Sequence, residues 1–211
     1  MPEKKSNRGY LKGSHFATWG KRVPNILLGV SGGAAAYKAV ELASKLTGVG
    51  ARVNTIMTEA ACRLICPKSF EAVTNSAVFT GLWDTNTEFK TSHINLVNWA
   101  DIVVVAPATA NIIGKIANGI CDDLLSTTLC VCWPLIKSGA VILAPAMNDN
   151  MWSNPAVQRN IRMVIEMGFQ LIGPVEGRLA CGTEGIGRMS EPQDILEAIE
   201  KIASEIKRRK R

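Results

Sequence analysis

The sequence lacks any apolar run of the roughly 20 residues that a membrane-spanning helix needs. Its first residues are polar and basic, unlike a secretory signal. Aromatic residues make up only 6% of the chain, so aliphatic side chains must form most of the core. Because 47% of the 211 residues are hydrophobic, the chain has enough apolar material for one large domain. We therefore expect a cytoplasmic protein without a membrane partner.

A net positive charge is missing from the part of the chain where a nucleic-acid-binding face would need it. The net charge is +6, but residues 207–211 carry +5 and residues 1–24 carry another +5, which leaves −4 on residues 25–206. A domain that binds nucleic acid carries its positive charge on the folded surface, so we expect no nucleic-acid partner. We interpret residues 1–24 as a flexible basic arm, 25–206 as the single folded domain and 207–211 as a basic tail.

A metal site and a disulfide framework are both poorly supported. The chain has six cysteines but only two histidines, and the cysteine pairs Cys62/Cys66 and Cys130/Cys132 do not have the spacing of a zinc site. Without a secretory signal, disulfides are not expected either. We predict no metal, and we interpret five of the cysteines as small buried hydrophobic residues. Cys181 is the exception, because its glycine-rich surroundings in LACGTEGIGRM (179–189) indicate a shaped, mobile loop.

Strand-like and helix-like segments alternate along the body of the chain. Apolar strand patterns occur at residues 26–30, 51–58, 101–110, 140–148 and 169–174. Helical patterns follow them at 34–46, from 59 onward, at 111–117 and 122–132, at 155–167 and after Pro192. We expect Thr58 and Asn154 to cap two of these helices. The alternation predicts an α/β fold, a doubly wound parallel sheet with helices on both faces and a single domain.

In such a sheet, ligands bind beyond the carboxyl ends of the strands. The first loop there is Ser31-Gly32-Gly33, which opens directly into a helix, where backbone N–H groups can approach a phosphate. The loop lacks the G-x-G-x-x-G pattern of dinucleotide sites, so it suits one phosphate, as in FMN, although a tight turn without a ligand explains it nearly as well. Thr109 and Asn111 begin a helix after another strand, where they could contact a phosphate or a ring, or Thr109 could be only a cap.

Two further side chains are candidates for chemistry. Asn148 in APAMNDNMWSNP follows a buried strand beside Met147, and its carboxamide could orient a carboxylate or simply form a turn. His93 is the histidine of the folded body, since His15 lies in the arm. A lone histidine is more often structural, but His93 could serve any step that needs a group titrating near neutrality.

Three blocks of the sequence together resemble one family. HINLVNWADIVVVAPATANIIGKIANGICDDLL, APAMNDNMWSNP and LACGTEGIGRM are similar to the signature blocks of the homo-oligomeric flavin-containing cysteine decarboxylases, over about residues 25–199. The likeness is greatest to the coenzyme A branch, which uses FMN to convert 4′-phosphopantothenoylcysteine to 4′-phosphopantetheine. The resemblance implies oxidation of the substrate thiol to a thioaldehyde, loss of carbon dioxide and re-reduction of the enethiolate.

The resemblance also implies roles for individual residues. The catalytic residues would be His93 and Cys181, and the substrate contacts would come from Asn148, Met147, Ala180 and Gly182. FMN would be bound by Ser31, Gly32, Gly33, Thr58, Ala108, Thr109, Ala110, Asn111 and Ala146. The family implies a homotrimer or a dodecamer of trimers. Since the chain ends after its last expected helix, we expect a separate ligase protein to make the substrate.

Other functions share parts of this pattern. Relatives that decarboxylate the C-terminal cysteine of peptides stop at the enethiol and have no use for Cys181. Non-catalytic FMN-binding regulatory subunits rely on acidic extensions, whereas both ends of this chain are basic. Flavin prenyltransferases share the fold and FMN but not the Pro-x-Met-Asn and Ala-Cys-Gly blocks. Cys181 therefore favours the coenzyme A branch.

Overall fold

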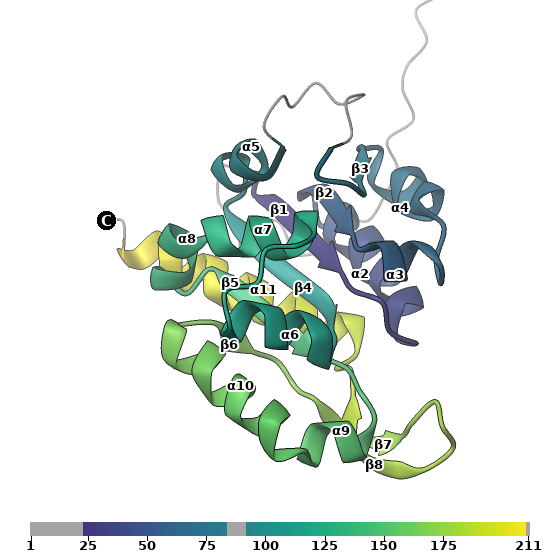
Figure 1. Cartoon of the computed structure of the whole chain (residues 1–211). Coiled ribbons are helices and arrows are strands. Elements are labelled where there is room, and N and C mark those ends of the chain that lie inside the picture. The colour runs from purple at the N-terminus through teal and green to yellow at the C-terminus, as the bar shows by residue number, and fades with distance from the viewer. Residues whose placement is uncertain (1–22, 84–91, 210–211) are drawn as a thin grey trace, which may run out of the picture.

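The computed structural model describes residues 23–83 and 92–209. Its centre is a parallel sheet of six strands in the order β3-β2-β1-β4-β5-β6 (Figure 1). The doubly wound parallel sheet that the sequence predicts is therefore confirmed. The strands are β1 (Asn25–Val30), β2 (Arg52–Met57), β3 (Val78–Phe79), β4 (Ile102–Ala108), β5 (Val141–Pro145) and β6 (Gln170–Leu171).

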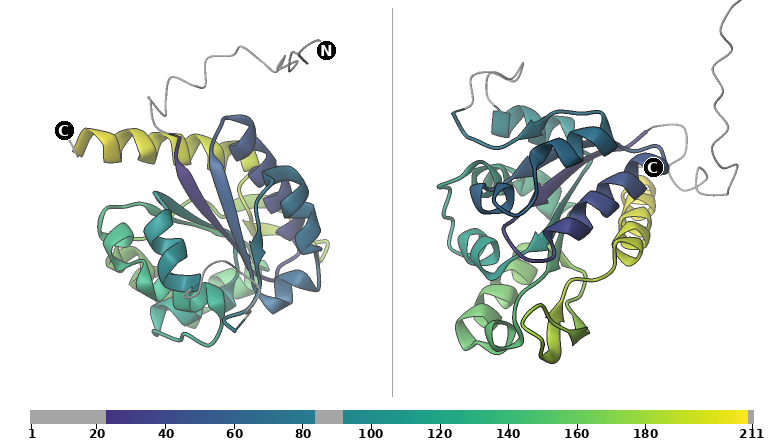
Figure 2. Two further views of the ribbon diagram at one scale, coloured as in Figure 1. Left: turned by 90° about the horizontal axis from the view of Figure 1, so that it is seen from above. Right: turned by 90° about the vertical axis from the view of Figure 1, so that its right-hand side faces the viewer.

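Two layers of helices cover the sheet, and β1, β4 and β5 are therefore buried along their whole length. On one face α2 packs beside α11 and α4, and Figure 2 shows α2 and α11 running along that face. On the other face α10 packs on α6, and α5 packs on α7. The helices are α2 (Ala36–Gly48), α3 (Glu59–Cys62), α4 (Pro67–Thr74), α5 (Ser92–Trp99), α6 (Ala110–Ala117), α7 (Leu124–Val131), α8 (Trp133–Lys137), α9 (Asp149–Ser153), α10 (Pro155–Met167) and α11 (Pro192–Arg209).

Side-chain caps set the start of several helices. The Thr58 hydroxyl accepts a hydrogen bond from the Ala61 N–H at the start of α3, and the Asn154 side chain accepts one from the Ala156 N–H at the start of α10. Both caps were expected, and Pro155 occupies the first turn of α10, where its missing N–H costs nothing. Asp123 and Ser126 form a reciprocal capping box at the start of α7.

The order of pairing creates a gap at one edge of the sheet. β1 pairs in parallel with β2 on one side and with β4 on the other. The chain therefore leaves β1 in one direction and leaves β4 in the opposite direction, and the loops after these two strands separate. This is the topological switch point at which doubly wound folds bind ligands.

The glycine-rich stretch 179–189 differs from the mobile loop that the sequence indicates. Its second half, Glu184–Arg188, is strand β8, which pairs antiparallel with β7 (Val175–Arg178) to form a hairpin. A Cβ atom at Gly187 would lie only 2.2 Å from the Met147 carbonyl oxygen. Gly187 therefore allows the hairpin to pack tightly on the loop after β5, and only residues 179–183 form the connecting turn. The expectation of a loop was therefore wrong for residues 184–188. Their strand packs on a segment distant in the sequence, and the local pattern of glycines does not reveal this contact.

The interpretation of five cysteines as buried was also wrong. Only Cys132 is buried among the described residues, Cys62 is half-buried, and the other four, Cys181 included, are exposed. Cys66 precedes the first turn of α4 as its N-cap residue, and Cys130 lies on the outward side of α7. Apolar neighbours in the sequence did not reveal that these thiols lie before a helix, between helices or on the outward side of one.

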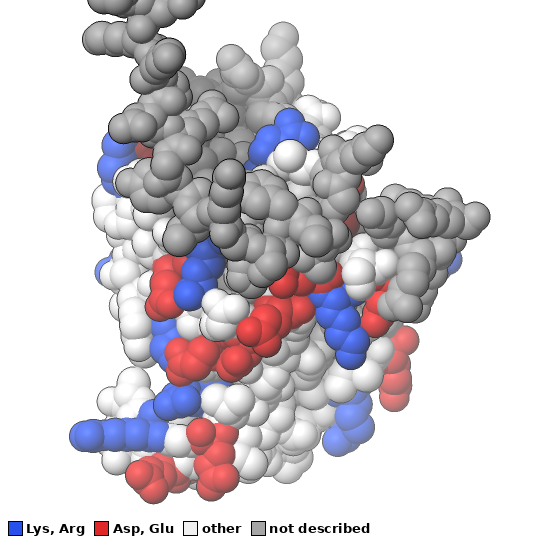
Figure 3. All heavy atoms as spheres, turned by 180° about the vertical axis from the view of Figure 1, so that it is seen from behind, with Lys and Arg blue, Asp and Glu red and all other residues white. Residues whose placement is uncertain are grey.

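The two expected basic ends lie largely outside the described residues. Residues 1–22 of the arm are not described, and in the tail α11 continues to Arg209, with residues 210–211 undescribed. No helix within 23–83 and 92–209 is long and apolar enough to span a bilayer. Seen from behind, acidic side chains form a band across the face where α11 lies (Figure 3).

Candidate active site

The loops at the carboxyl edge of the sheet enclose a cavity of about 650 Å³ at the switch point. This volume is in the usual range for small-molecule sites, roughly 300–1,000 Å³. The loops after β1, β4 and β5 and the tip of the β7–β8 hairpin line it. Of the residues predicted from the sequence, it brings together Gly32, Gly33, Thr109, Asn111, Ala146, Met147, Asn148, Ala180 and Cys181.

The start of α2 presents unused hydrogen-bond donors to this cavity. The N-cap residue Ala35 has no side-chain cap, and no described residue accepts a hydrogen bond from the backbone N–H of Gly32, Gly33 or Ala34. The first turn of α2 also carries no acidic side chain. Free N–H groups at the positive end of a 13-residue helix form a site for an anion such as a phosphate.

Ser31 lies behind this turn and joins it to the next loop. Its hydroxyl donates to the Pro107 carbonyl oxygen at 2.7 Å and accepts from the Thr109 N–H at 3.1 Å. Ser31 is itself buried. It thus holds the loops after β1 and β4 together, while Gly33 and Thr109 line the cavity.

Asn148 begins α9 at the wall of the cavity and has both ends of its carboxamide engaged. Its Oδ1 accepts a hydrogen bond from the Asn150 N–H at 2.9 Å, which makes it the N-cap of α9. Its Nδ2 donates to the Sγ of Cys181 at 3.2 Å. Because the cap determines which end of the amide is oxygen, the NH₂ group is directed toward the thiol.

Cys181 lies at the hairpin tip with polar partners on two sides. Its Sγ is 3.1 Å from the Thr183 Oγ1 and also receives the hydrogen bond from Asn148. The Thr183 hydroxyl and N–H, followed by Asn148, hold the pKa of the exposed Cys181 thiol below its usual value because they stabilise the thiolate. The thiol is consequently a stronger acid than an ordinary cysteine.

Three cations that we did not single out in the sequence also line the cavity: Lys38, Arg178 and Arg188. Lys38 and Arg188 both pair with Glu191, at 2.8 Å and 3.3 Å. The hydrogen bond from Lys38 lowers the pKa of the Glu191 carboxyl group. Viewed singly along the chain, these cations are indistinguishable from solvated surface charges, and only the fold brings them together.

Six predicted site residues do not line the cavity. Ser31 supports the turn from behind, Thr58 caps α3, and Ala108 is buried in β4. Ala110 is the first residue of α6, and Gly182 lies in the hairpin turn with a φ of 91°. His93 lies on α5, which packs on α7 at the opposite end of the molecule from α9 and the hairpin (Figure 1).

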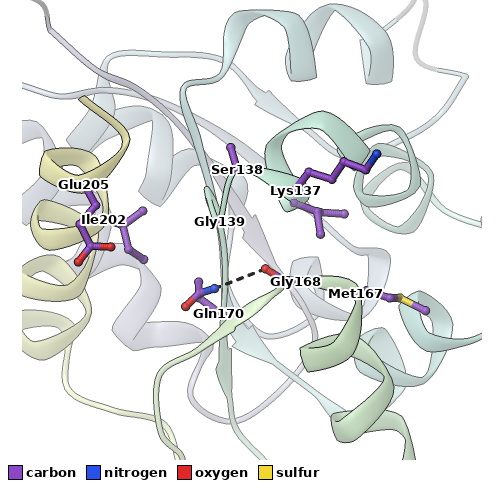
Figure 4. Close-up of a pocket in the computed structure, with 9 residues that line it drawn as sticks. Lys137, Ser138, Gly139, Met167, Gly168, Gln170, Ile202 and Glu205 are labelled. Carbon is purple, nitrogen blue, oxygen red and sulfur yellow. Dashed lines mark hydrogen bonds between the residues drawn. The ribbon is translucent and has the colours of Figure 1, made fainter. Parts of the chain in front are cut away.

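A smaller cavity of about 300 Å³ lies at the other edge of the sheet, where β5 and β6 begin (Figure 4). The Gln170 Nε2 donates to the Gly168 carbonyl oxygen there, at 3.5 Å. The amino ends of parallel strands are not where such folds bind ligands, and none of the described residues that line this cavity is a cysteine or a histidine. Within the described residues, no three His, Cys, Asp or Glu side chains group closely enough to hold a metal ion.

Comparison with known proteins places this geometry in context. A family model described as Flavoprotein matches residues 18–204. The Coenzyme A biosynthesis bifunctional protein CoaBC of Bacillus subtilis is 49% identical over 181 residues, which are 86% of this chain and 43% of that protein. The chain therefore spans less than half the length of this relative.

Two solved structures share the fold over nearly their whole length. One is a PPC decarboxylase mutant complexed with pantothenoylaminoethenethiol, which is 35% identical, with a TM-score of 0.76 over 85% of this chain and 98% of that one. The other is the FMN-dependent cysteine decarboxylase SpaF, 33% identical, with a TM-score of 0.71 over 86% of this chain and 97% of that one.

Proposed function

Because this chain belongs to the flavoprotein family, we propose that it decarboxylates 4′-phosphopantothenoylcysteine to 4′-phosphopantetheine with FMN as its cofactor. The solved PPC decarboxylase and the CoaBC relative support this activity and its place in coenzyme A biosynthesis. The observation that carries the proposal is the contact between Asn148 and Cys181. Two segments 33 residues apart place a carboxamide donor and an acidic thiol 3.2 Å from each other at the wall of the cavity.

The cavity fits FMN better than a dinucleotide. The free N–H groups of Gly32 and Gly33 at the start of α2 would hold its single phosphate, and Thr109, Asn111 and Ala146 would border the rest. FMN, when bound, would accept two electrons from the substrate thiol and return them after carbon dioxide has left, so that the overall reaction is redox-neutral.

Asn148 would hold the carboxylate that is lost. Its cap hydrogen bond directs the NH₂ group into the site, where one N–H is donated to Cys181 and the other is available to a carboxylate. Once the thiol has become a thioaldehyde, the carbon–carbon bond to the carboxylate can break. Carbon dioxide leaves, and the bonding electrons move toward sulfur to give the enethiolate.

Cys181 would supply the proton that completes the reaction. Reduction of the carbon–carbon double bond of the enethiolate adds one hydrogen to each of its two carbons. One hydrogen would arrive with the two electrons that the cofactor returns, and the other would arrive as the proton from Cys181. The lowered pKa of the Cys181 thiol suits a donor that must give up its proton near neutrality. Thr183 would stabilise the thiolate that remains, and water would later return the proton.

His93 would act in the site of a neighbouring subunit. It does not line the cavity of its own chain, and α5 lies at the other end of the molecule. A base for the oxidation step would then come from a second copy, which agrees with a homotrimer in which each subunit completes the next. A heterologous interface of this kind brings different surfaces of the two copies together.

The proposal is tested by incubating the purified, FMN-loaded protein with 4′-phosphopantothenoylcysteine. We expect carbon dioxide and the saturated thiol 4′-phosphopantetheine in equal amounts, measured by mass spectrometry. A peptide ending in cysteine serves as the competing substrate. Turnover of the peptide alone, or release of the enethiol as the final product, would contradict the proposed function.

A further inference from the structure

Among the residues that the structure describes, one cation of the cavity, Arg178, has no ion-pair partner. Lys38 and Arg188, the other two, share the Glu191 carboxylate. The register of the hairpin sets Arg178 opposite Glu184, yet across residues 23–83 and 92–209 no carboxylate oxygen lies within 4.0 Å of the Arg178 guanidinium. Arg178 is exposed and lines the cavity.

We propose that Arg178 binds the 4′-phosphate of the substrate and selects it over unphosphorylated pantothenoylcysteine. This inference rests on the proposed function. A guanidinium presents its donors in a rigid fork that matches two phosphate oxygens, and it stays charged at every working pH. An unpaired arginine can form this contact without first breaking an ion pair, unlike Lys38 and Arg188.

The position of Arg178 suits one end of an elongated substrate. It is the last residue of β7, and Cys181 follows three residues later at the hairpin tip. Three residues of chain span at most about 10 Å, to which the long arginine side chain adds its own reach. The thiol and carboxylate end of the substrate can therefore lie at Cys181 and Asn148 while its phosphate lies at Arg178.

A second phosphate, that of FMN, has its own set of donors. The N–H groups at the start of α2 come from a different loop, and neither they nor the turn that carries them involves the hairpin. Loss of Arg178 should therefore leave the FMN content unchanged. This separates a contact to the substrate phosphate from a contact to the cofactor.

The test compares kcat/KM for substrates with and without the 4′-phosphate in the FMN-loaded protein. For Arg178→Ala we expect a fall of about 10- to 100-fold with the phosphorylated substrate, the usual effect of losing a hydrogen bond between charged groups. With the unphosphorylated substrate we expect less than about a twofold change, since that substrate makes no such contact. Arg178→Lys, which keeps the charge but not the fork, should lie between Arg178→Ala and the wild type.

Arg162→Ala is the matched control. Arg162 is exposed on α10 and does not line the cavity, so its loss removes the same charge from the surface without touching the site. We expect wild-type kinetics with both substrates. An equal fall with both substrates for Arg178→Ala, a loss of FMN, or a wild-type protein that does not prefer the phosphorylated substrate would each overturn the role of Arg178. Failure of the wild-type protein to turn over either substrate would instead overturn the proposed function on which that role rests.

Discussion

In the proposed function, the single carboxamide of Asn148 serves both the fold and the reaction. Its oxygen caps α9, and its nitrogen faces Cys181. A turn-forming residue and a substrate-binding residue were alternatives at the level of sequence, and the geometry makes them compatible. The two roles depend on different atoms, so a substitution can remove one and keep the other.

Asn148→Asp should lower kcat/KM by about 100-fold or more while leaving the melting temperature nearly unchanged. Aspartate caps helices as well as asparagine does, but it replaces the donors with a negative charge that repels the substrate carboxylate. Steady-state kinetics and thermal unfolding measure the two effects. Asn148→Ala is the control, because it removes the cap as well and should cost about 1 kcal/mol of stability. A strongly destabilised Asn148→Asp protein would assign Asn148 to the fold alone.

Thr183 should set the pH above which the final reduction fails. Its hydroxyl and N–H lower the pKa of Cys181, and the hydroxyl is the larger effect. Thr183→Val removes the hydroxyl, so the pKa of the thiol rises and the thiol stays protonated to higher pH. We expect the alkaline limb of the pH profile for saturated product to move to higher pH, and the rate near neutrality to fall because the thiol is a weaker acid.

The ratio of saturated thiol to enethiol, followed against pH by mass spectrometry, is the measurement for Thr183→Val. Thr183→Ser keeps the hydroxyl and should keep the wild-type profile. An unchanged alkaline limb in Thr183→Val would show that Thr183 does not act on the thiol that titrates.

At the scale of elements, the β7–β8 hairpin depends on Gly187, because the loop after β5 packs directly against this residue and leaves no room for a side chain. Gly187 accepts a hydrogen bond from the Met147 N–H at 2.9 Å, and its φ is not positive, so the requirement for glycine comes from contact and not from backbone conformation. The same loop continues into Asn148. The hairpin that carries Cys181 and the loop that carries Asn148 therefore form one packed unit.

Gly187→Ala should push the β7–β8 hairpin away from the loop after β5. The added methyl group would lie 2.2 Å from the Met147 carbonyl oxygen, which is backbone and cannot move aside cheaply. We expect a loss of about 1–3 kcal/mol of stability, measured by urea unfolding, with a larger proportional loss of activity. Gly48→Ala at the end of α2 is the control, since nothing lies within 4 Å of its added methyl, and it should be neutral or slightly stabilising. Wild-type activity in Gly187→Ala would contradict a rigid link between Asn148 and Cys181.

The elements that the sequence predicts are those whose signals are local. The buried strands and the caps at Thr58 and Asn154 depend on neighbours in the chain, and the structure confirms them. The β7–β8 hairpin escaped prediction because Gly187 makes room for Met147, more than 30 residues away in the chain. The three cations of the cavity escaped for the same reason, since their convergence is a property of the folded chain.

For the whole molecule, His93 raises the question of how many chains make one site. The cavity holds Asn148 and Cys181, and α5 lies away from it. If His93 is the base, each site needs a second chain. The assembly would then be a condition of activity, and dilution into monomers would abolish it.

Co-expression of His93→Asn chains with Cys181→Ser chains tests this arrangement. Each variant alone should form no saturated thiol, because one lacks the base and the other lacks the proton donor. In mixed assemblies a His93→Asn chain contributes an intact cavity and its neighbour contributes His93, so about one site in four should recover activity under random mixing. Asn148→Asp mixed with Cys181→Ser is the control, since both changes affect the cavity wall. We expect no recovery in this control, because Asn148 and Cys181 belong to the same chain and no mixed cavity keeps both. Recovery in the control, or no recovery with His93→Asn, would contradict the shared site.

The exposure of the thiols has a practical consequence for chemical labelling. Four cysteines are exposed, whereas burial raises the pKa of Cys132 to about 12 and makes it unreactive. Inactivation by an alkylating reagent would therefore not identify Cys181 without mapping the modified peptides. A protein with Cys66, Cys121 and Cys130 changed to serine would leave Cys181 as the exposed thiol of the described chain. A fluorophore attached there would report directly on what enters and leaves the cavity.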